Sequence, residues 1–401
     1  MRHSSRLQAQ VLEASLKAFL GSATMILSQN ATSRPLLARG AAARQQRSLG
    51  QRCIASAAPA SAKSKIDWET LGFGLQDVAE HMFVAEWHDG AWGKGELKPY
   101  GPLQMMPSAQ VLNYGQAVFE GMKAQRTAKD RIVLFRPERN AARIKAGAQR
   151  LSMPEFPEAE FVAAVEATVR ANQDYVPPMG KGSLYLRPLL MGSGPILGLG
   201  PAPSYTLCVY CAAVGSYFKG GQLTPIDLVV EEVFHRAAPR GMGGTKAAGN
   251  YSPVLVTQLA AKKKGFADVV YLDARHDTYL EEVSSCNIFA VKGNTIRTPP
   301  LTGSILPGVT RASVIELARS LGYDVREEPI AVTDAMEADE LFTTGTAVVV
   351  SPVGSLTHKG EKRQFGTPGE PTKVGLQIYT ALTRLQTEQD PDPFGWVHPV
   401  A

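Results

Sequence analysis

An eleven-residue stretch from Gly241 to Tyr251, with the sequence GMGGTKAAGNY, restricts the possible chemistry of this chain more than any other segment. It holds a single lysine, Lys246, and four glycines. Glycine lets the backbone adopt positive φ angles and approach a bulky partner closely. A lysine in such a loop can be held in one orientation with a lowered pKa, as Schiff-base chemistry requires. A flexible surface loop with a solvated lysine is the alternative. A nucleotide phosphate loop is excluded, because Thr245 precedes the lysine and Ala247 follows it.

The charge of the chain is unevenly distributed. The formal net charge is +5, but residues 1–60 hold seven arginines, Lys17 and one acid, Glu13, so that about −2 remains on the rest. The body is therefore not basic, and we expect no nucleic-acid partner. An apolar share of 44% in 401 residues suits a globular enzyme with two domains. No apolar run is long enough to span a membrane, so no membrane partner is expected.

Residues 1–62 have the composition of an organelle transit peptide, because they are rich in arginine, serine and alanine and poor in acids. We expect this leader to be disordered and to be cleaved near its end. A plastid is favoured, since the Ser/Ala-rich sequence continues to about residue 62. The weakly amphipathic stretch Leu7–Leu20 favours a mitochondrion instead.

The remaining apolar pattern predicts an α/β fold with mixed sheets in two domains. A small N-terminal domain is expected over 63–218, an interdomain connection around Lys219-Gly220-Gly221 at 219–224, and a larger domain over 225–401. The predicted helices follow Pro137, Pro157, Pro253, Pro307 and Pro371. The predicted strands include Leu184–Met191, Thr206–Val214, Ile226–Val233, Asp268–Leu272 and Glu281–Val291, the last paired with Thr295–Thr298.

Two cysteines, Cys208 and Cys211, share a predicted buried strand. Their CxxC spacing invites a metal or redox interpretation. However, residues three apart on a strand point to opposite faces, and no second pair completes a zinc site. Packing in the core is favoured, and no metal site is expected.

Three features would suit a pyridoxal 5′-phosphate site. The first is an anion cup, in which Leu306–Arg311 opens a helix with free amides and a predicted turn at Thr343–Thr346 adds hydroxyls. The second is Glu282, at the start of a predicted strand, which could hold a pyridinium proton. The third is Arg143, on a predicted helix. Each feature has an ordinary alternative: a helix cap and turn, a solvated strand end and a surface ion pair.

Six motifs in one order then resemble the branched-chain aminotransferases, which are fold type IV pyridoxal-phosphate enzymes. The resemblance covers most of the chain from about Phe83 to Val400. The motifs are YGQAVFEGMKA at 114–124, LFRPERNAAR at 134–143, LYLRPLL at 184–190, GGTKAAGNYSP at 243–253, EVSSCNIF at 282–289 and ILPGVTR at 305–311.

The resemblance implies a role for each matched residue. Lys246 would be the catalytic Schiff-base lysine, and the larger domain would bind pyridoxal 5′-phosphate. The other cofactor contacts would be Arg143, Tyr251, Glu282, Val309, Thr310 and Thr346. The substrate contacts would be Tyr114, Phe119, Tyr185, Arg187, Ala347 and, reaching the pocket of a neighbouring subunit, Leu199. A homodimer is therefore implied.

The implied activity is reversible amino transfer between leucine, isoleucine or valine and 2-oxoglutarate, so the other partners would be small amino acids and 2-oxo acids. D-amino-acid aminotransferases and aminodeoxychorismate lyases share the fold, but the extended motif at 114–124 argues against both. A basic RNA- or nucleotide-binding protein is disfavoured by the charge of the body. Mammalian members carry a redox CxxC where this chain has Val348 and Ser351. We therefore expect that form of thiol switching to be absent.

Overall fold

The structure is a computed structural model that describes residues 66–216 and 223–400. The predicted leader at 1–62 and the predicted turn Lys219-Gly220-Gly221 lie outside the described residues. Residues 65–401 form one compact unit that contains two β-sheets. The predicted mixed α/β class is confirmed, whereas the domain boundaries at 63–218 and 225–401 stay a prediction.

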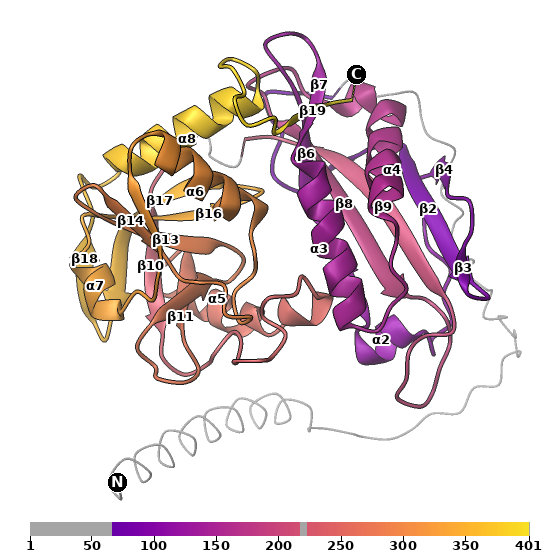
Figure 1. The fold of residues 1–401 in the computed structure, drawn as a ribbon, viewed down its shortest axis with the longest axis horizontal. Helices are drawn as coiled ribbons and strands as arrows, with labels where there is room; N and C mark the ends of the chain where they lie inside the picture. Colours follow the sequence, from indigo (N-terminus) through magenta and orange to yellow (C-terminus); the bar gives the residue numbers. More distant parts are fainter. Residues whose placement is uncertain (1–65, 217–222, 401) are drawn as a thin grey trace, which may run out of the picture. The chain divides into compact units, whose positions relative to one another are not determined.

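The first sheet has ten strands, all paired antiparallel, with the central order β19-β7-β6-β8-β9-β2-β3. Helices α3 (Pro137–Arg150) and α4 (Glu158–Ala171) pack on it (Figure 1). The last strand of the chain pairs with β7 and so belongs to this sheet. The strands are β1 (Asp77–Val78), β2 (His81–His88), β3 (Ala91–Trp92), β4 (Glu96–Pro99), β5 (Ala117–Phe119), β6 (Met122–Arg126), β7 (Ile132–Phe135), β8 (Ser183–Gly192), β9 (Tyr205–Val214) and β19 (Val397–Pro399).

The buried residues of α3 and α4 recur at helical spacing along one face of each helix. Proline occupies the first position of α3, where a missing N–H costs nothing. The apolar stripe of α4 is buried in the core of the first sheet. The predicted core packing of the two cysteines is also confirmed, because Cys208 packs with Met82 and Val84 while Cys211 lies in the core on the opposite face of β9. The buried positions of α4 are Phe161, Ala164, Val165, Thr168 and Val169.

The second sheet has nine strands in the order β12-β11-β10-β17-β16-β13-β14-β15, with β18 on β17. An additional pairing of β12 with β13 closes six of them into a ring. The strands are β10 (Ile226–Glu231), β11 (Asp268–Leu272), β12 (Leu280–Val283), β13 (Asn287–Lys292), β14 (Thr295–Thr298), β15 (Asp324–Glu327), β16 (Glu340–Gly345), β17 (Val349–His358) and β18 (Glu361–Gln364). The accompanying helices are α5 (Val254–Lys263), α6 (Val309–Ser320), α7 (Val332–Met336) and α8 (Lys373–Gln386). Helix α2 (Gln110–Tyr114) precedes β5 of the first sheet.

Two predictions for the second sheet are wrong. The strand predicted over Glu281–Val291 is two antiparallel strands, because residues 284–286 turn the chain and Glu282 pairs with Asn287. The turn predicted at Thr343–Thr346 begins later, at Thr346. Its first residues extend β16, where β-branched threonine is favoured. The first error arises where ring closure sets the strand ends, and the second where the hairpin pairing of β16 with β17 extends the strand to Gly345.

The described part of the chain contains no helix long and apolar enough to cross a membrane. Its His, Cys, Asp and Glu residues form no group of three or more that could hold a metal ion. These two findings concern the described residues alone.

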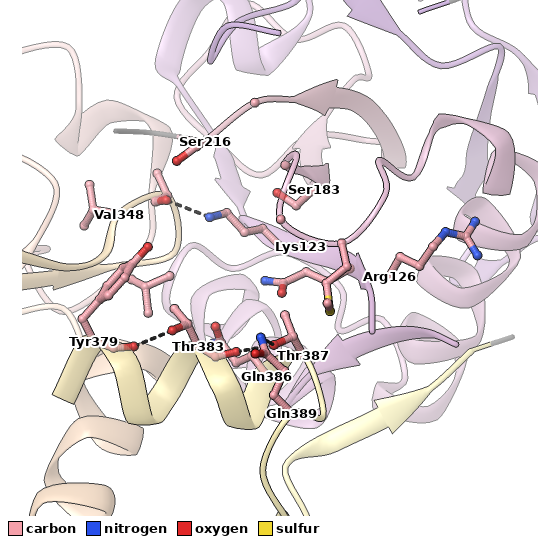
Figure 2. Close-up of a pocket in the computed structure, with 17 residues that line it drawn as sticks. Lys123, Arg126, Ser183, Ser216, Val348, Tyr379, Thr383, Gln386, Thr387 and Gln389 are labelled. Carbon is pink, nitrogen blue, oxygen red and sulfur yellow. Dashed lines mark hydrogen bonds between the residues drawn. The ribbon is translucent and has the colours of Figure 1, made fainter. Parts of the chain in front are cut away.

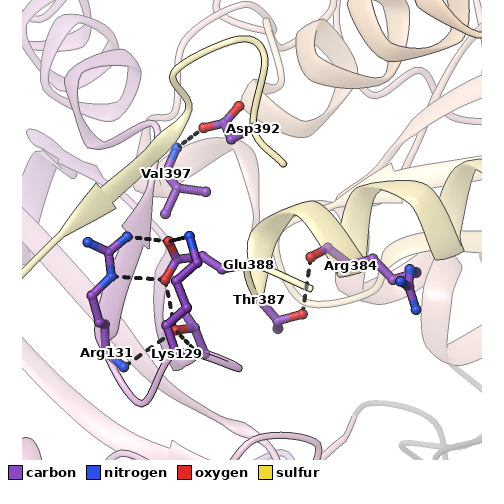
Figure 3. A network of polar contacts seen from close by, with 8 residues as sticks. Lys129, Arg131, Arg384, Thr387, Glu388, Asp392 and Val397 are labelled. Atoms are coloured by element: carbon purple, nitrogen blue, oxygen red, sulfur yellow. Dashed lines mark hydrogen bonds and ion pairs between the residues drawn. The ribbon is translucent and has the colours of Figure 1, made fainter. Parts of the chain in front are cut away.

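A buried carboxylate ties the end of α8 to the turn between β6 and β7 (Figure 3). The side chain of Glu388 is 7% exposed and accepts two hydrogen bonds from the Arg131 guanidinium. Thr127 Oγ1 donates at 2.8 Å and Lys129 Nζ at 3.3 Å. The hydrogen bond from Arg131 is the main reason that the pKa of Glu388 falls from 4.5 to about 2.

We predict that Glu388→Gln lowers the free energy of unfolding by about 1–3 kcal/mol at neutral pH, because a charge-assisted pair becomes a neutral contact. A carboxylate with a lowered folded-state pKa stabilises the fold above its unfolded value of about 4.5. That contribution should be lost as the pH falls towards about 2. Urea unfolding at pH 7 and pH 3 measures both effects. Asp390→Asn, which removes an exposed ion pair with Arg384, is the control and should change stability by less than about 1 kcal/mol. Equal midpoints for Glu388→Gln and wild type would contradict the assignment.

Candidate active site

The lysine loop is held against the first sheet. Phe119 N donates to the Lys246 carbonyl at 3.1 Å, and Val118 forms an isolated bridge with Ala247. Gly243 lies so close to the Ser304 carbonyl that a Cβ at this position would be 1.9 Å from the oxygen. The glycines of the motif thus permit close backbone approach. These contacts argue against the alternative of a flexible surface loop.

The Lys246 amine lies among aromatic rings. Its Nζ donates to the Tyr251 hydroxyl at 3.1 Å and is 4.6 Å from the centroid of the Phe119 ring. The Phe119 and Tyr251 rings meet edge to face, with centroids 4.9 Å apart. Burial raises the pKa of Tyr251 to about 12, so its hydroxyl stays protonated at neutral pH.

Burial is also the main reason that the pKa of Lys246 falls to about 8. The positive charges of Arg143 and Arg187 lower this pKa further. The carboxylates of Glu120 and Glu282 raise it and so oppose the shift. The result is an amine that carries a large neutral fraction close to pH 8.

Glu282 is 2% exposed and lies at the ring closure of the second sheet. Its Oε1 accepts hydrogen bonds from Arg236 Nη1 at 2.6 Å and from the Leu306 amide at 3.0 Å. Burial raises the pKa of Glu282 to about 7, against the opposing charge of Arg236. Glu281 points to the other face of β12 and accepts a hydrogen bond from Ser304 Oγ. Arg236 belongs to no recognised sequence motif and was missed by the sequence analysis.

Arg143 makes a two-pronged ion pair with Glu120, which is fully buried. Nε donates to one carboxylate oxygen at 2.7 Å and Nη2 to the other at 2.6 Å. Nη1 donates to the Pro307 carbonyl at 3.0 Å, which links Arg143 to the loop before α6. Asn140 donates to Glu120 at 2.8 Å. Glu120 was not among the predicted site residues, although it lies within the motif at 114–124 and a carboxylate between two strands was a usable signal.

A small cavity joins the start of α6 to the turn between β16 and β17, and Val309, Thr310 and Thr346 line it. Helix α6 has no side-chain cap, so its first amides are free for an anion. Thr346 Oγ1 donates to the Gly121 carbonyl at 3.2 Å. The predicted anion cup is therefore assembled, with its hydroxyl supplied by Thr346 rather than by Thr343.

Lys123 holds the same turn from β6. Its Nζ donates to the Ala347 carbonyl at 2.7 Å (Figure 2). Burial lowers the pKa of Lys123 to about 8. The amine also lines a more open cavity that Ser183, Thr383 and Gln386 border (Figure 2). Lys123 was not among the predicted site residues.

Arg187 lines an aromatic cavity of about 190 Å³, and its positive charge acts on Lys246. Its Cζ is 4.9 Å from the centroid of the Phe119 ring and 5.7 Å from that of Tyr185. Its Nε is buried and has no hydrogen-bond partner among the described residues. Phe73 and Tyr210 also line this cavity, and both were missed by the sequence analysis.

Among the described residues, two predicted substrate residues form no hydrogen bond or ring contact with the residues around Lys246 and Arg187. The Tyr114 hydroxyl donates to the Leu197 carbonyl at 2.6 Å on an exposed loop. The side chain of Leu199, on the same loop, is 88% exposed. The structure therefore brings together the predicted residues other than these two.

The assembled groups can bind a phosphorylated, ring-nitrogen-containing aldehyde. A lysine of lowered pKa can bond covalently to the aldehyde, and a buried carboxylate can hold a protonated ring nitrogen. A helix start, an arginine and a hydroxyl can bind the phosphate. The unpaired Arg187 Nε leaves a donor for a carboxylate of a second small molecule.

Comparison with known proteins agrees with this chemistry. The profile of the family described as amino-transferase class IV matches residues 117–356. Branched-chain-amino-acid aminotransferase 5, chloroplastic, of Arabidopsis thaliana is 52% identical over 334 residues, which are 83% of this chain and 80% of the relative. Branched-chain amino acid aminotransferase 2, chloroplastic, of Humulus lupulus is 53% identical over 332 residues, with 82% and 81% covered. The mitochondrial aminotransferase 1 of Humulus lupulus is 47% identical over 350 residues, with 87% and 88% covered.

Solved structures show the same fold. The branched-chain amino acid aminotransferase of Escherichia coli matches with a TM-score of 0.70 at 29% identity, over 80% of this chain and all of that one. The enzyme of T.th., complexed with N-(5′-phosphopyridoxyl)-L-glutamate, matches with a TM-score of 0.67 at 27% identity, over 81% of this chain and all of that one. This chain belongs to the class IV aminotransferases and, within them, to the branched-chain aminotransferase family.

Proposed function

We propose that this protein transfers the amino group reversibly between leucine, isoleucine or valine and 2-oxoglutarate, with pyridoxal 5′-phosphate as cofactor. The observation that carries the proposal is the convergence of Lys246, Glu282 and Arg143 beside the free amides of α6. The names of the relatives support the choice of branched-chain substrates.

The described residues suit the cofactor at each end. Arg143, the amides of Val309 and Thr310, and Thr346 would bind its phosphate. Glu282 would hold the proton of the ring nitrogen, and Tyr251 would donate to the ring hydroxyl. When bound, the cofactor supplies an electron sink for the bond electrons of the substrate Cα.

Lys246 would carry the substrate α-proton. A pKa of about 8 leaves roughly a tenth of the amine neutral at pH 7 and half at pH 8, so it can accept a proton and return it. The Phe119 and Tyr251 rings border the amine and would exclude water from it. Because Lys246 is held through its own carbonyl by Phe119, its amine moves within a fixed loop.

The same pocket must accept an aliphatic and a carboxylate side chain. The rings of Phe119 and Tyr185 would form an apolar wall for the first. Arg187, whose Nε lacks a partner among the described residues, would bind the second. The amide of Ala347 would bind the substrate carboxylate from a turn that Lys123 holds in place.

A homodimer is part of the proposal, and exposed apolar side chains support it. Leu197 and Leu199 are almost fully exposed on a loop that Tyr114 anchors. Such an exposed group of apolar residues suits a protein interface. We propose that this loop, with Leu199 and Tyr114, completes the substrate pocket of the second subunit.

We also propose that residues 1–62 are a plastid transit peptide and that domains meet at 219–224. The composition of the leader and the chloroplastic relatives support the location. A mitochondrial location is the alternative, since two relatives carry that name.

The first prediction concerns the Lys246 amine, which must be neutral to bond to the cofactor. With the pKa lowered from 10.5 to about 8, the rate of covalent attachment to cofactor-free protein should rise with pH and level off above about 8. Borohydride reduction followed by peptide mass spectrometry should place the cofactor on Lys246. Lys246→Ala should still bind the cofactor non-covalently, but its transamination rate should fall by a factor of about 10² to 10⁴. A rate that keeps rising to pH 10 would mean that Lys246 has an unshifted pKa.

The second prediction concerns Arg187→Met. This change removes the charged donor from the aromatic cavity, so kcat/KM for 2-oxoglutarate should fall about ten- to a hundredfold. The value for 4-methyl-2-oxopentanoate, which has no second carboxylate, should change far less. Arg126→Met, which breaks an ion pair with Asp130 outside this cavity, is the control. Equal losses for both substrates would assign Arg187 a structural role.

The third prediction compares two adjacent carboxylates on β12. Glu282→Gln should keep the cofactor bound but slow each half-reaction about ten- to a hundredfold, because a neutral amide no longer favours the protonated ring. Glu281→Gln, on the opposite face, should leave the rates nearly unchanged. Stopped-flow absorbance of single half-reactions measures both. If Glu281→Gln were the slower variant, the cofactor would have to lie on the other face of β12.

A further inference from the structure

One buried carboxylate next to the anion cup has no assigned contact with the proposed cofactor or substrate. Glu120 is fully buried between β5 and β6, and its amide donates to the Pro188 carbonyl at 2.8 Å. Its carboxylate accepts three hydrogen bonds, two from Arg143 and one from Asn140. Burying a carboxylate this completely is costly unless its partners are well placed.

We infer that Glu120 is a positioning residue for the cofactor phosphate, which fixes the guanidinium of Arg143 without touching the phosphate itself. The inference rests on the proposed function, because it assigns a group to the phosphate site of that cofactor. It adds a residue to the set that the sequence motifs supplied.

The hydrogen-bond inventory of Arg143 supports this role. A guanidinium carries five N–H donors in a planar fork. Glu120 takes two of them, at Nε and Nη2, and the Pro307 carbonyl takes one at Nη1. Two donors are left, one each on Nη1 and Nη2. Because the three bonded donors fix the plane of the guanidinium, the two remaining N–H donors point in set directions.

The other contacts connect this fork to the cup. Pro307 directly precedes Gly308, the N-cap of α6, so the bond from Arg143 joins the arginine to the helix start. Asn140 lines the small cavity together with Val309 and Thr346 and also donates to Glu120. Glu120 is therefore linked to the cup through both of its partners.

An ordinary buried ion pair is the competing explanation. Glu388 is a suitable comparison, because it too is nearly buried and binds an arginine through both oxygens. Its partners lie at the turn between β6 and β7 and include none of the residues assigned to the cofactor. A purely structural pair should affect folding alone, as we expect for Glu388, whereas a positioning residue should affect binding of the phosphate specifically.

The experiment compares two cofactor forms that differ in the phosphate. Pyridoxal 5′-phosphate and pyridoxal are titrated into the cofactor-free full chain, and absorbance gives each dissociation constant. Wild type should prefer the phosphorylated form strongly. Glu120→Gln should weaken binding of pyridoxal 5′-phosphate about ten- to a hundredfold, because the guanidinium loses its charge-assisted anchor. Binding of pyridoxal should change less than about threefold, and Glu388→Gln should change neither constant.

A thermodynamic cycle with Arg143→Met tests the route of the effect. If Glu120 acts through Arg143, adding Glu120→Gln to Arg143→Met should weaken pyridoxal 5′-phosphate binding no further. Glu120→Asp keeps the charge but withdraws the oxygens, so it should show the same selective loss. It carries the test if Glu120→Gln does not fold. Equal weakening of both forms, or an undiminished effect in the double variant, would overturn the inference. A wild type without preference for the phosphorylated form would instead overturn the proposed function.

Discussion

The site depends on backbone and side-chain bonds from one short segment of the first sheet, Phe119–Lys123. The Phe119 amide holds the lysine loop, and Glu120 holds Arg143. The Gly121 carbonyl accepts a hydrogen bond from Thr346 Oγ1, and Lys123 Nζ donates one to the Ala347 carbonyl. Four parts of the site are thus set by five consecutive residues. Since β5 and β6 both pair with the long strand β8, the segment is part of a rigid sheet and can define distances between the parts it holds.

The electrostatics of the site follow from burying more cations than carboxylates. Two carboxylates, Glu120 and Glu282, face four cations of the described site, which are Lys246, Arg143, Arg187 and Arg236. Each carboxylate is bound to an arginine. Burial moves the pKa of Lys246 down and that of Glu282 up, so each of these groups stands closer to neutrality than it would in water. A phosphate dianion would add negative charge to a site that holds more cations than carboxylates. The arrangement therefore favours an anionic cofactor over a neutral one.

Local sequence predicted the elements whose buried residues recur at a regular spacing. The buried positions of α4 follow from their spacing, and Lys246 and Glu282 follow from their motifs. Local sequence could not predict where ring closure ends a strand, as at residues 284–286, because that depends on β12 meeting β13. It also missed Glu120 and Arg236. Their partners lie 23 and 46 residues away in the chain, so neither pairing can be read from local sequence, although Glu120 does stand within the motif at 114–124.

The turn at residues 346–348 is held by two of the hydrogen bonds from the Phe119–Lys123 segment. The pairing of Gly345 with Val349 leaves a three-residue hairpin loop, which usually takes a residue with positive φ beside it. Val349 fills that position with φ +60°, a conformation that costs a β-branched residue about 1–3 kcal/mol. The bonds from Lys123 to Ala347 and from Thr346 to Gly121 act on the same turn and can offset this cost. The strain is therefore located where the amide of Ala347 and the hydroxyl of Thr346 must be presented together, and the first sheet supplies the contacts that maintain it.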